Sequence, residues 1–395
     1  MNGINLNDPV SVANPDAYWA KYRSDGPIQW SEAHRSWVIL SHLELSEAFR
    51  DGTLLSTDRV TPLERVAANR PSAFQQVVEL LSGWMIFRDP PVHTHLRDPM
   101  RHVFTPRKVL TLEKMVTAVV RETVLMLPDE IDVRRDLAGP LPALIIANLL
   151  GVDSDDLDQF CRWSDDLATI VFATDPHLTP PELAMDAAGQ FQEFFGALID
   201  RERKQPSGTL LTALVDGAGT ELSDLELVGA CTLILFAGHE TTSSFLMNTL
   251  GLLARDPHLF SLLRSANIEK AVEELFRVIG PTRSMYRKVA KPHTRHGQKF
   301  AVNENVLLCV EAANHDPLAF ENPGVIDFSR ELNPHLSFGW GLHHCLGAHL
   351  ARLEARVILE AVLERAESLI PLAPVPPIEG TVIASIAKPL RIRFE

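Results

Sequence analysis

Residues Phe338 to Arg352 read FGWGLHHCLGAHLAR. Glycines at positions 339, 341 and 347 flank Cys345, and they let the backbone approach a large, flat ligand and turn N–H groups toward the sulfur. An amphipathic helical pattern runs from Cys345 to about Glu367. Cys345 is therefore expected at the N-terminus of a helix, where unpaired N–H groups and the helix dipole favour a thiolate. The stretch predicts a cysteine that is ready to bind a metal ion.

A second informative stretch is the long helix predicted from Ser223 to Asp256. Ser223 and Glu226 match a capping box, and Pro257 follows the last helical residue. Such a helix is about 50 Å long, and its middle is apolar on every side, so it should cross the protein interior. Yet its centre, AGHETT from 237 to 242, contains a carboxylate, which must be paired, hydrated or protonated there. We expect this centre to serve a polar function.

The rest of the chain is predicted to be mainly α-helical with small β-sheets. Helical periodicity dominates from about Pro106 to Leu253. Short strands are expected at SWVIL (Ser36 to Leu40), at NVLLCVEA (Asn305 to Ala312) and in the last fifteen residues. No internal repeat, low-complexity tract or long polar linker divides the sequence, so we expect one domain over residues 1–395.

Composition excludes several classes of protein. The 395 residues include 51 acidic and 37 basic side chains, a net charge of −14, which disfavours nucleic acid as a partner. The longest nearly uncharged apolar stretch, Leu227 to Gly238, is too short for the roughly 20 residues of a bilayer span. No signal peptide is recognisable, and the cysteines are too sparse for a disulfide scaffold, so we expect a cytoplasmic protein that does not bind membranes. The cysteines are Cys161, Cys231, Cys309 and Cys345.

The cysteine stretch resembles the haem-binding signature of the cytochrome P-450 family. All nine defined residues of F-G-x-G-x-H-x-C-x-G-x-x-L-A-R are matched. Two further family motifs occur in the expected order, the Ala237 to Thr242 helix centre and the Glu-x-x-Arg of Glu274 and Arg277. The resemblance spans essentially the whole chain and implies the cytochrome P-450 fold, with haem between the long central helix and the cysteine-bearing loop and helix.

The resemblance also assigns residues to the cofactor, haem b (iron protoporphyrin IX). Cys345 is implied to be the axial ligand of the iron, because electron donation from its thiolate promotes O–O cleavage. Propionate partners are implied at His93, Arg97, Arg287 and His343, with a solvated surface pair as the alternative for His93 and Arg97. The remaining implied haem contacts are Ala237 and Gly238, which leave room beside the iron, and Phe338, Gly339 and Gly347.

The family resemblance gives Glu240 and Thr241 a role in catalysis, because an acid and a hydroxyl together deliver protons during oxygen activation. The alternative is a Thr241 that bonds back to the helix and a Glu240 that is paired elsewhere. Glu274 and Arg277 are three residues apart on one helix face, and the resemblance implies that they hold the haem-binding loop. Their role is expected to be structural.

The implied activity is that of a haem-thiolate monooxygenase. It would insert one atom of O2 into a small, mostly hydrophobic substrate by hydroxylation, O-dealkylation or epoxidation. No G-x-G-x-x-G fingerprint follows a strand, so electrons should come from a ferredoxin and its reductase. Candidate cations for ferredoxin docking are Arg101, Arg107, Lys108, Arg352 and Arg356. Three alternatives remain: a peroxide-driven enzyme, a haem-binding protein without turnover, and a zinc site made by His335, His343, His344, Cys345 and His349.

The resemblance also places the substrate pocket. Its lining is implied at residues 60–87, 170–181, 233–237, 282–285 and 383–386, which are mostly apolar. Arg283 is the exception, and we expect it to face solvent rather than a substrate carboxylate or phenol. The proline-rich segment from Asp175 to Pro181 is expected to form a mobile lid. Asn303 or Asn305 is expected to replace a turn glycine, because asparagine tolerates positive φ.

Overall fold

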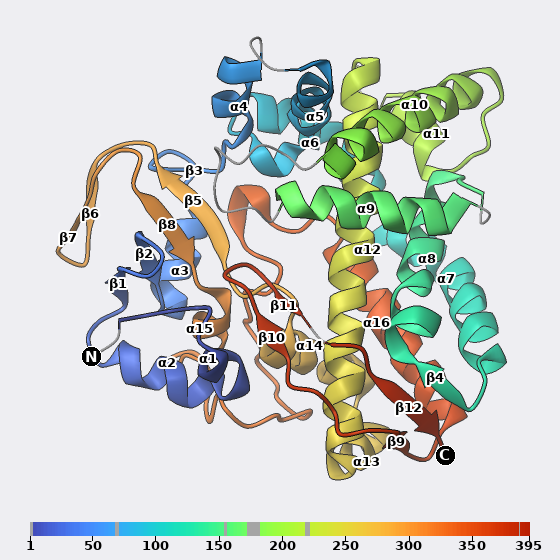
Figure 1. Ribbon diagram of the computed structural model, residues 1–395. Helices are drawn as coiled ribbons and strands as arrows, with labels where there is room; N and C mark the ends of the chain where they lie inside the picture. The colour runs from blue at the N-terminus through green and yellow to red at the C-terminus, as the bar shows by residue number, and fades with distance from the viewer. Residues whose placement is uncertain (1–2, 68–70, 154–155, 172–181, 218–221, 387) are drawn as a thin grey trace. The chain divides into compact units, whose positions relative to one another are not determined.

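The computed structural model describes residues 3–67, 71–153, 156–171, 182–217, 222–386 and 388–395 (Figure 1). Their backbone packs into two compact units, each built from several stretches of the chain. Unit 1 comprises Met1–Ser56, Val116–Ala138 and Thr241–Glu395, and unit 2 comprises Thr57–Met115 and Gly139–Glu240. The expected lid from Asp175 to Pro181 lies outside the described residues.

All of the described β-strands lie in unit 1. Its largest sheet has the strand order β1-β2-β8-β5-β3, in which β2 and β8 are parallel and the other pairs are antiparallel. The strands are β1 (Ile28–Ser31), β2 (Ser36–Ile39), β8 (Asn305–Leu308), β5 (Met285–Val289) and β3 (Leu55–Ser56). Smaller sheets are formed by β4 (Glu130–Asp132), β12 (Arg391–Phe394) and β9 (Leu369–Pro371), by β6 (His293–Arg295) and β7 (Gln298–Phe300), and by β10 (Glu379–Gly380) and β11 (Ser385–Ile386).

Helices make up most of the rest of the described chain. Unit 1 contains α1 (Pro9–Ala13), α2 (Pro15–Arg23), α3 (His42–Arg50), α13 (Pro257–Ser265), α14 (Ile268–Ile279), α15 (Val310–Asn314) and α16 (Ala348–Arg365). Unit 2 contains α4 (Val60–Ala67), α5 (Ser72–Ser82), α6 (Val92–Val103), α8 (Pro140–Leu150), α9 (Leu157–Val171), α10 (Glu182–Lys204) and α11 (Leu210–Val215). Two helices, α7 (Pro106–Met126) and α12 (Asp224–Arg255), contribute residues to both units. The prediction of a mainly α-helical fold with small sheets is confirmed.

The long helix α12, yellow in Figure 1, matches its predicted bounds within one residue at each end. The capping box is formed as expected, since the Ser223 N–H donates to Glu226 Oε2 at 2.8 Å and the Glu226 N–H donates to Ser223 Oγ at 3.4 Å. At the other end Asp256 caps the next helix, α13, whose first residue is Pro257. Local signals therefore fix both ends of this helix.

The strand predicted from Asn305 to Ala312 is correct only in its first half. β8 ends at Leu308, and residues Val310–Asn314 form α15. The parallel neighbour β2 ends at Ile39, opposite Leu308, so no ladder continues beyond that point. The backbone of the next turn is hydrogen-bonded as a helix instead. In the preceding turn Asn303 has φ +69°, so the prediction of an asparagine in place of a turn glycine is confirmed.

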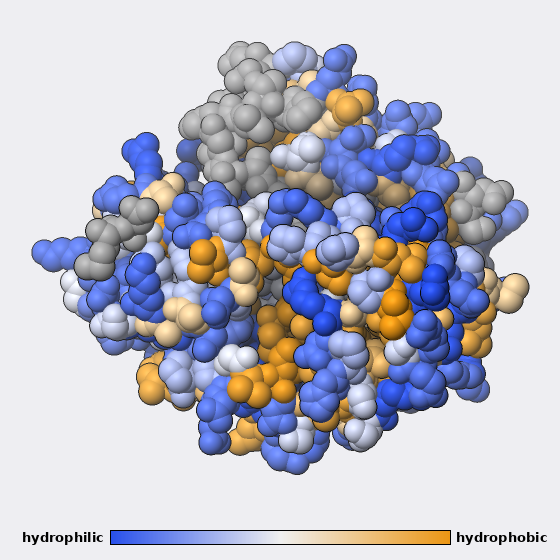
Figure 2. All heavy atoms as spheres, turned by 60° about the horizontal axis from the view of Figure 1, so that its bottom comes forward, coloured by the Kyte–Doolittle hydropathy of each residue, from blue (hydrophilic) through white to orange (hydrophobic). Residues whose placement is uncertain are grey.

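Hydrophilic residues predominate on the face drawn in Figure 2, and hydrophobic residues gather in patches among them. The core of unit 1 includes Ile39, Leu308, Val306 and Phe49, all of which are almost completely buried between the main sheet and its helices. Among the described residues, no helix combines the length and the apolar composition that a membrane crossing requires.

Two glycines set a close approach between α5 and α12 in unit 2. A Cβ atom added to Gly229 on α12 would lie 2.7 Å from the Cα of Gly83, the residue that caps α5. Gly229→Ala should therefore lower the free energy of unfolding by about 1 to 3 kcal/mol, because backbone must move to admit the methyl group. Urea denaturation measures this loss. The control is Gly196→Ala in α10, where a Cβ has open space; there we expect no loss, and an equal loss in both variants would contradict the packing argument.

Candidate functional site

Cys345 lies in the turn that leads into α16. Its N–H donates to the Phe338 carbonyl at 2.8 Å, and Gly347, two residues later, caps the 18-residue helix. The thiol is exposed. The helix begins at Ala348 rather than at Cys345, so the expected start lies three residues too early. The residue is thus held by its own loop in the turn before α16.

The loop before Cys345 needs glycine at two positions. Gly339 and Gly341 have φ of +66° and +70°, a region that side chains with a Cβ rarely adopt. A Cβ at Gly341 would also lie 2.6 Å from the carbonyl oxygen of Phe49 on α3. These glycines shape the loop that carries the sulfur. The backbone conformation therefore explains why the motif has glycine at both positions.

The centre of α12 has one open face. Ala237 and Thr241, one helical turn apart, are exposed, whereas Phe236, His239 and Thr242 beside them are buried. Gly238 has a separate packing reason, because a Cβ there would lie 2.6 Å from Cδ1 of Ile146 on α8. The same helix thus combines close packing with a face on which a flat ligand can rest.

Glu240 follows on the same turn of α12. Its side chain is 18% exposed, and its Oε1 lies 3.5 Å from Nδ1 of the buried His239. One carboxylate oxygen, Oε1, is therefore buried, while part of the side chain reaches solvent. This intermediate setting suits an acid that exchanges protons during a reaction.

In unit 2, α6 carries His93 and Arg97 one turn apart. His93 is completely buried and Arg97 is half-buried, so the alternative of a solvated surface pair is wrong for His93. Burial first, and then the charge of Arg97, lower the pKa of His93 to about 4. The imidazole is therefore neutral near pH 7, where it can donate a hydrogen bond to an anionic group without carrying charge.

In unit 1, Arg287 and His343 are the other expected propionate partners. Arg287 is 8% exposed in the middle of β5, paired with Val306 of β8, and its Nη1 donates to the Tyr286 carbonyl at 2.8 Å. His343 is half-buried in the short 3-10 turn Gly341–His343. The four expected partners are thus divided equally between the two units, and all lie in ordered helices, strands or turns.

The predicted pairing of Glu274 and Arg277 on α14 is present. Both side chains are fully buried, and Arg277 donates Nε and Nη2 to the two carboxylate oxygens at 2.8 Å each. Arg277 also donates to the carbonyls of Asn314, Pro323 and Val325. Glu274 accepts from the Asp327 N–H, from Arg330 and from Asn333. The pair therefore fastens the irregular chain between α15 and the cysteine loop to α14.

A second network beside this pair was not predicted. Arg352 on α16 donates to both oxygens of Glu273 on α14 at 2.6 and 2.9 Å, and its guanidinium lies 4.3 Å above the Phe338 ring. His335 Nε2 lies 3.1 Å from the same carboxylate. Burial would raise the pKa of Glu273, but the hydrogen bonds from His335 and Arg352 lower it to about 2. Glu273 and Glu274 are adjacent on one helix, and neighbouring helical residues do not share a face, so two adjacent acids are a signal for two separate networks.

The expectation about Arg283 needs correction. Arg283 does not face solvent: it is 1% exposed, and it donates to Glu311, to Ser11 and to the carbonyls of Leu6 and Thr381. Its partners come from distant stretches of unit 1, which sequence spacing does not reveal.

Arg352 and Arg356 were also expected among the cations for ferredoxin docking. Arg352 pairs with Glu273 and Arg356 lies 3.2 Å from Glu360, and their part in docking stays a prediction. Arg101, Arg107 and Lys108 are exposed at the end of α6 and the start of α7 in unit 2, and Arg101 lies 3.6 Å from Asp98.

The donor set at position 345 fits haem better than zinc. No group of three or more His, Cys, Asp or Glu side chains suited to a metal ion occurs in the part of the chain that the structure describes. His335, one of the candidate zinc ligands, is committed to Glu273. A structural zinc site needs four protein ligands, whereas a porphyrin would supply four nitrogens itself and would need only one ligand from the protein, which can be a cysteine thiolate. A single exposed thiol in a glycine-shaped loop meets that requirement.

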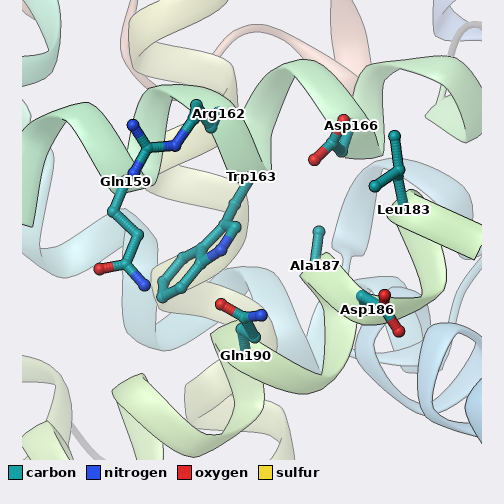
Figure 3. A pocket seen from close by; sticks show the side chains of 8 residues that line it. All are labelled: Gln159, Arg162, Trp163, Asp166, Leu183, Asp186, Ala187 and Gln190. Carbon is teal, nitrogen blue, oxygen red and sulfur yellow. The ribbon is translucent and has the colours of Figure 1, made fainter.

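A surface pocket of about 300 Å³ lies between α9 and α10 (Figure 3). Trp163, Arg162 and Asp166 line it from α9, and Asp186 and Gln190 line it from α10. It contains none of the predicted site residues. The segment 172–181 of the expected substrate lining is outside the described ranges, so the lining stays a prediction.

Comparisons with known proteins agree with this assignment. The family model described as Cytochrome P450 matches residues 184–266 and 267–394. The putative cytochrome P450 YjiB of Bacillus subtilis is 30% identical over 100% of this chain and 96% of that protein. The cytochrome P450 monooxygenase PikC of Streptomyces venezuelae is 33% identical over 91% of this chain and 85% of that protein.

Solved structures show the same fold. P450BioI in complex with an acyl carrier protein ligated with hexadec-9Z-enoic acid has a TM-score of 0.86 at 28% identity, with 98% of this chain and 99% of that chain covered. CYP109E1 from Bacillus megaterium in complex with testosterone has a TM-score of 0.83 at 27% identity, with 99% and 100% covered.

Glu274→Ala should yield little haem-loaded protein. Removing the carboxylate leaves Arg277 buried without its counter-charge, at a cost of about 3 to 5 kcal/mol. The ratio of haem absorbance to protein absorbance after purification measures the loading. Glu269→Ala on the same helix changes an exposed side chain and should load normally. Soluble, fully loaded Glu274→Ala protein would refute the structural role of the pair.

The Glu273 network predicts a specific pH dependence of stability. Because the folded-state pKa of Glu273 lies below its usual value of 4.5, its stabilisation is complete above about pH 4.5 and is lost as the pH falls toward 2. Glu273→Gln should therefore be less stable than the wild type at pH 6, and the difference should shrink as the pH falls to 3. Denaturant unfolding at several pH values measures the difference. A constant difference would mean that the carboxylate charge does not stabilise the fold.

Proposed function

This chain belongs to the cytochrome P450 family of haem-binding monooxygenases, and we propose that Cys345 is the axial ligand through which it holds haem b. The observation that carries the proposal is the exposed thiol of Cys345 at the N-terminus of α16, in a loop shaped by Gly339 and Gly341. Haem b supplies, when bound, the iron that binds and activates O2. The helix dipole favours the thiolate form of Cys345 that this ligation needs.

The remaining proposed haem contacts are residues that can bind the anionic propionates or that leave space for the macrocycle. His93, Arg97, Arg287 and His343 would hold the propionates, the arginines by charge and the histidines by hydrogen bonding. Ala237 offers a small exposed side chain on α12, while Phe338, Gly339 and Gly347 bring backbone to the thiolate side. Gly238 lets α12 pack against α8 at this level, which supports the position of Ala237.

Glu240 and Thr241 are proposed to deliver protons during oxygen activation. The Thr241 side chain is exposed on the open face of α12, and the adjacent Glu240 is partly buried. A hydroxyl next to an acid can pass protons inward through water while the acid recharges from solvent. This retained pair favours O2 and electrons over a peroxide-driven enzyme.

The proposed substrate is a small, mostly hydrophobic molecule that gains one oxygen atom by hydroxylation, O-dealkylation or epoxidation. Two structural neighbours hold apolar molecules, a fatty acyl chain and a steroid. The implied lining on α12, residues 233–237, contains Leu233, Ile234 and Phe236. Apolar walls with few polar groups are typical of sites for such ligands.

Electrons are proposed to come from a ferredoxin and its reductase. The sequence lacks a dinucleotide-binding fingerprint, so the reductant must act through another protein. Arg101, Arg107 and Lys108 are exposed cations that suit an acidic donor. Arg352 and Arg356 form ion pairs with glutamates, as Arg101 does with Asp98, and all five cations remain candidates for docking.

Turnover with labelled oxygen tests the proposed function. Compounds are first screened for a spectral shift of the haem on binding, and a binder is then incubated with ferredoxin, reductase and ¹⁸O2. We expect substrate-dependent consumption of reductant and a product that carries one ¹⁸O atom. Binding without consumption of reductant would favour a haem protein without turnover. For hydroxylation or epoxidation, an unlabelled product would exclude a monooxygenase; for O-dealkylation the label is carried by the released aldehyde, and its absence there would have the same meaning.

Thr241→Ala should uncouple reductant consumption from product formation. Without the hydroxyl, proton delivery fails, and the yield of product per reductant should fall by about tenfold while hydrogen peroxide accumulates. Parallel assays of product, peroxide and reductant measure the coupling. Thr242→Ala removes a buried hydroxyl from the next position and should retain normal coupling. Equal coupling in both variants would remove Thr241 from the mechanism.

A further inference from the structure

Unit 2 contains a thiol, an imidazole and a carboxylate in contact with one another. Cys161 on α9 has its Sγ 3.8 Å from Nε2 of His239 on α12. The other ring nitrogen of His239, Nδ1, lies 3.5 Å from Oε1 of Glu240. His239 is 5% exposed, so its ring is held between the other two groups by packing. The sequence motif gave His239 no role, and the haem assignments do not use Cys161.

We propose that Cys161 is an activated thiol and a site of covalent modification by soft electrophiles and by hydrogen peroxide. The imidazole of His239 can accept the thiol proton through Nε2. The Glu240 carboxylate beside Nδ1 then stabilises the imidazolium that results. Sulfur nucleophiles are generally activated by a base positioned next to the thiol and by a carboxylate that orients this base. This inference concerns thiol chemistry and goes beyond the monooxygenase activity.

The other cysteines provide an internal contrast. Cys231 and Cys309 are completely buried, and burial raises the pKa of each thiol to about 12. Cys345 is exposed but is assigned to the haem iron. Cys161 has intermediate exposure, so reagents can reach it, and its Sγ lies 3.8 Å from an imidazole nitrogen. Selective reaction at this position is therefore expected.

Two reactions define the chemistry. With iodoacetamide, the Cys161 sulfur forms a bond to carbon, the carbon–iodine bond breaks, iodide leaves, and the thiol proton stays on His239. With hydrogen peroxide, sulfur forms a bond to one oxygen, the O–O bond breaks, and the departing hydroxide takes the proton from His239 as water. The second reaction converts the thiol into a sulfenic acid and consumes one peroxide.

Alkylation rates in the full-length holoenzyme test the proposal. The protein is treated with iodoacetamide at pH 7, and the peptides that contain each cysteine are quantified by mass spectrometry over time. We expect Cys161 to react at least about tenfold faster than Cys231 or Cys309. His239→Gln retains an amide of similar reach but no base, and it should slow alkylation of Cys161 by about tenfold at unchanged haem content. An equal rate at Cys161 in wild type and His239→Gln would overturn the proposal.

A second variant keeps the proposal testable if His239→Gln does not fold. Glu240→Gln removes the charge that stabilises the imidazolium and should slow Cys161 alkylation by about threefold; an unchanged rate would overturn the proposed array. For the peroxide reaction, dimedone traps sulfenic acid. We expect adducts on the Cys161 peptide in the wild type and their loss in Cys161→Ser. No adduct at Cys161 in peroxide-treated wild type would limit the site to alkylation and overturn the peroxide part.

Discussion

The proposed function depends on one interaction, the bond that the sulfur of Cys345 would form to haem iron from the turn before α16. A thiolate is favoured there by the dipole and the unpaired N–H groups of α16, both of which act only within the first turn. The loop that carries Cys345 must therefore keep a fixed geometry relative to α16. Positive φ at Gly339 and Gly341 and the hydrogen bond from the Cys345 N–H to Phe338 provide that geometry locally.

Buried charges on α14 extend this support. Glu274 and Arg277 tie α14 to the chain between α15 and the cysteine loop, and Glu273 ties it to α16 and to His335. Adjacent residues of one helix thus hold two flanks of the same loop. Buried ion pairs add little net stability when complete, but an incomplete one is costly, so such networks enforce a single arrangement. On the central helix α12, glycines fix the arrangement instead, because other elements pack closely against the helix at these positions.

Sequence alone predicted the features that depend on local spacing. The ends of α12, the capping box at Ser223, the Glu274–Arg277 pair and the positive φ of Asn303 all arise from residues within a few positions of each other. Features that depend on distant stretches were missed. Arg283 meets residues from both ends of the chain, and Arg352 meets Glu273 across two helices. The end of β8 is set by the length of β2, about 270 residues earlier, which no local pattern contains. The roles of the candidate site residues at the haem stay predictions, because they concern a ligand as well as the chain.

The most direct measurement is the absorption spectrum of the purified, haem-loaded protein after reduction and addition of carbon monoxide. Thiolate ligation by Cys345 predicts the long-wavelength band that is characteristic of iron bound to a cysteine sulfur. Cys345→Ser protein should lack that band. A wild-type spectrum with only the shorter-wavelength band of histidine-ligated haem, in folded and fully loaded protein, would contradict the account.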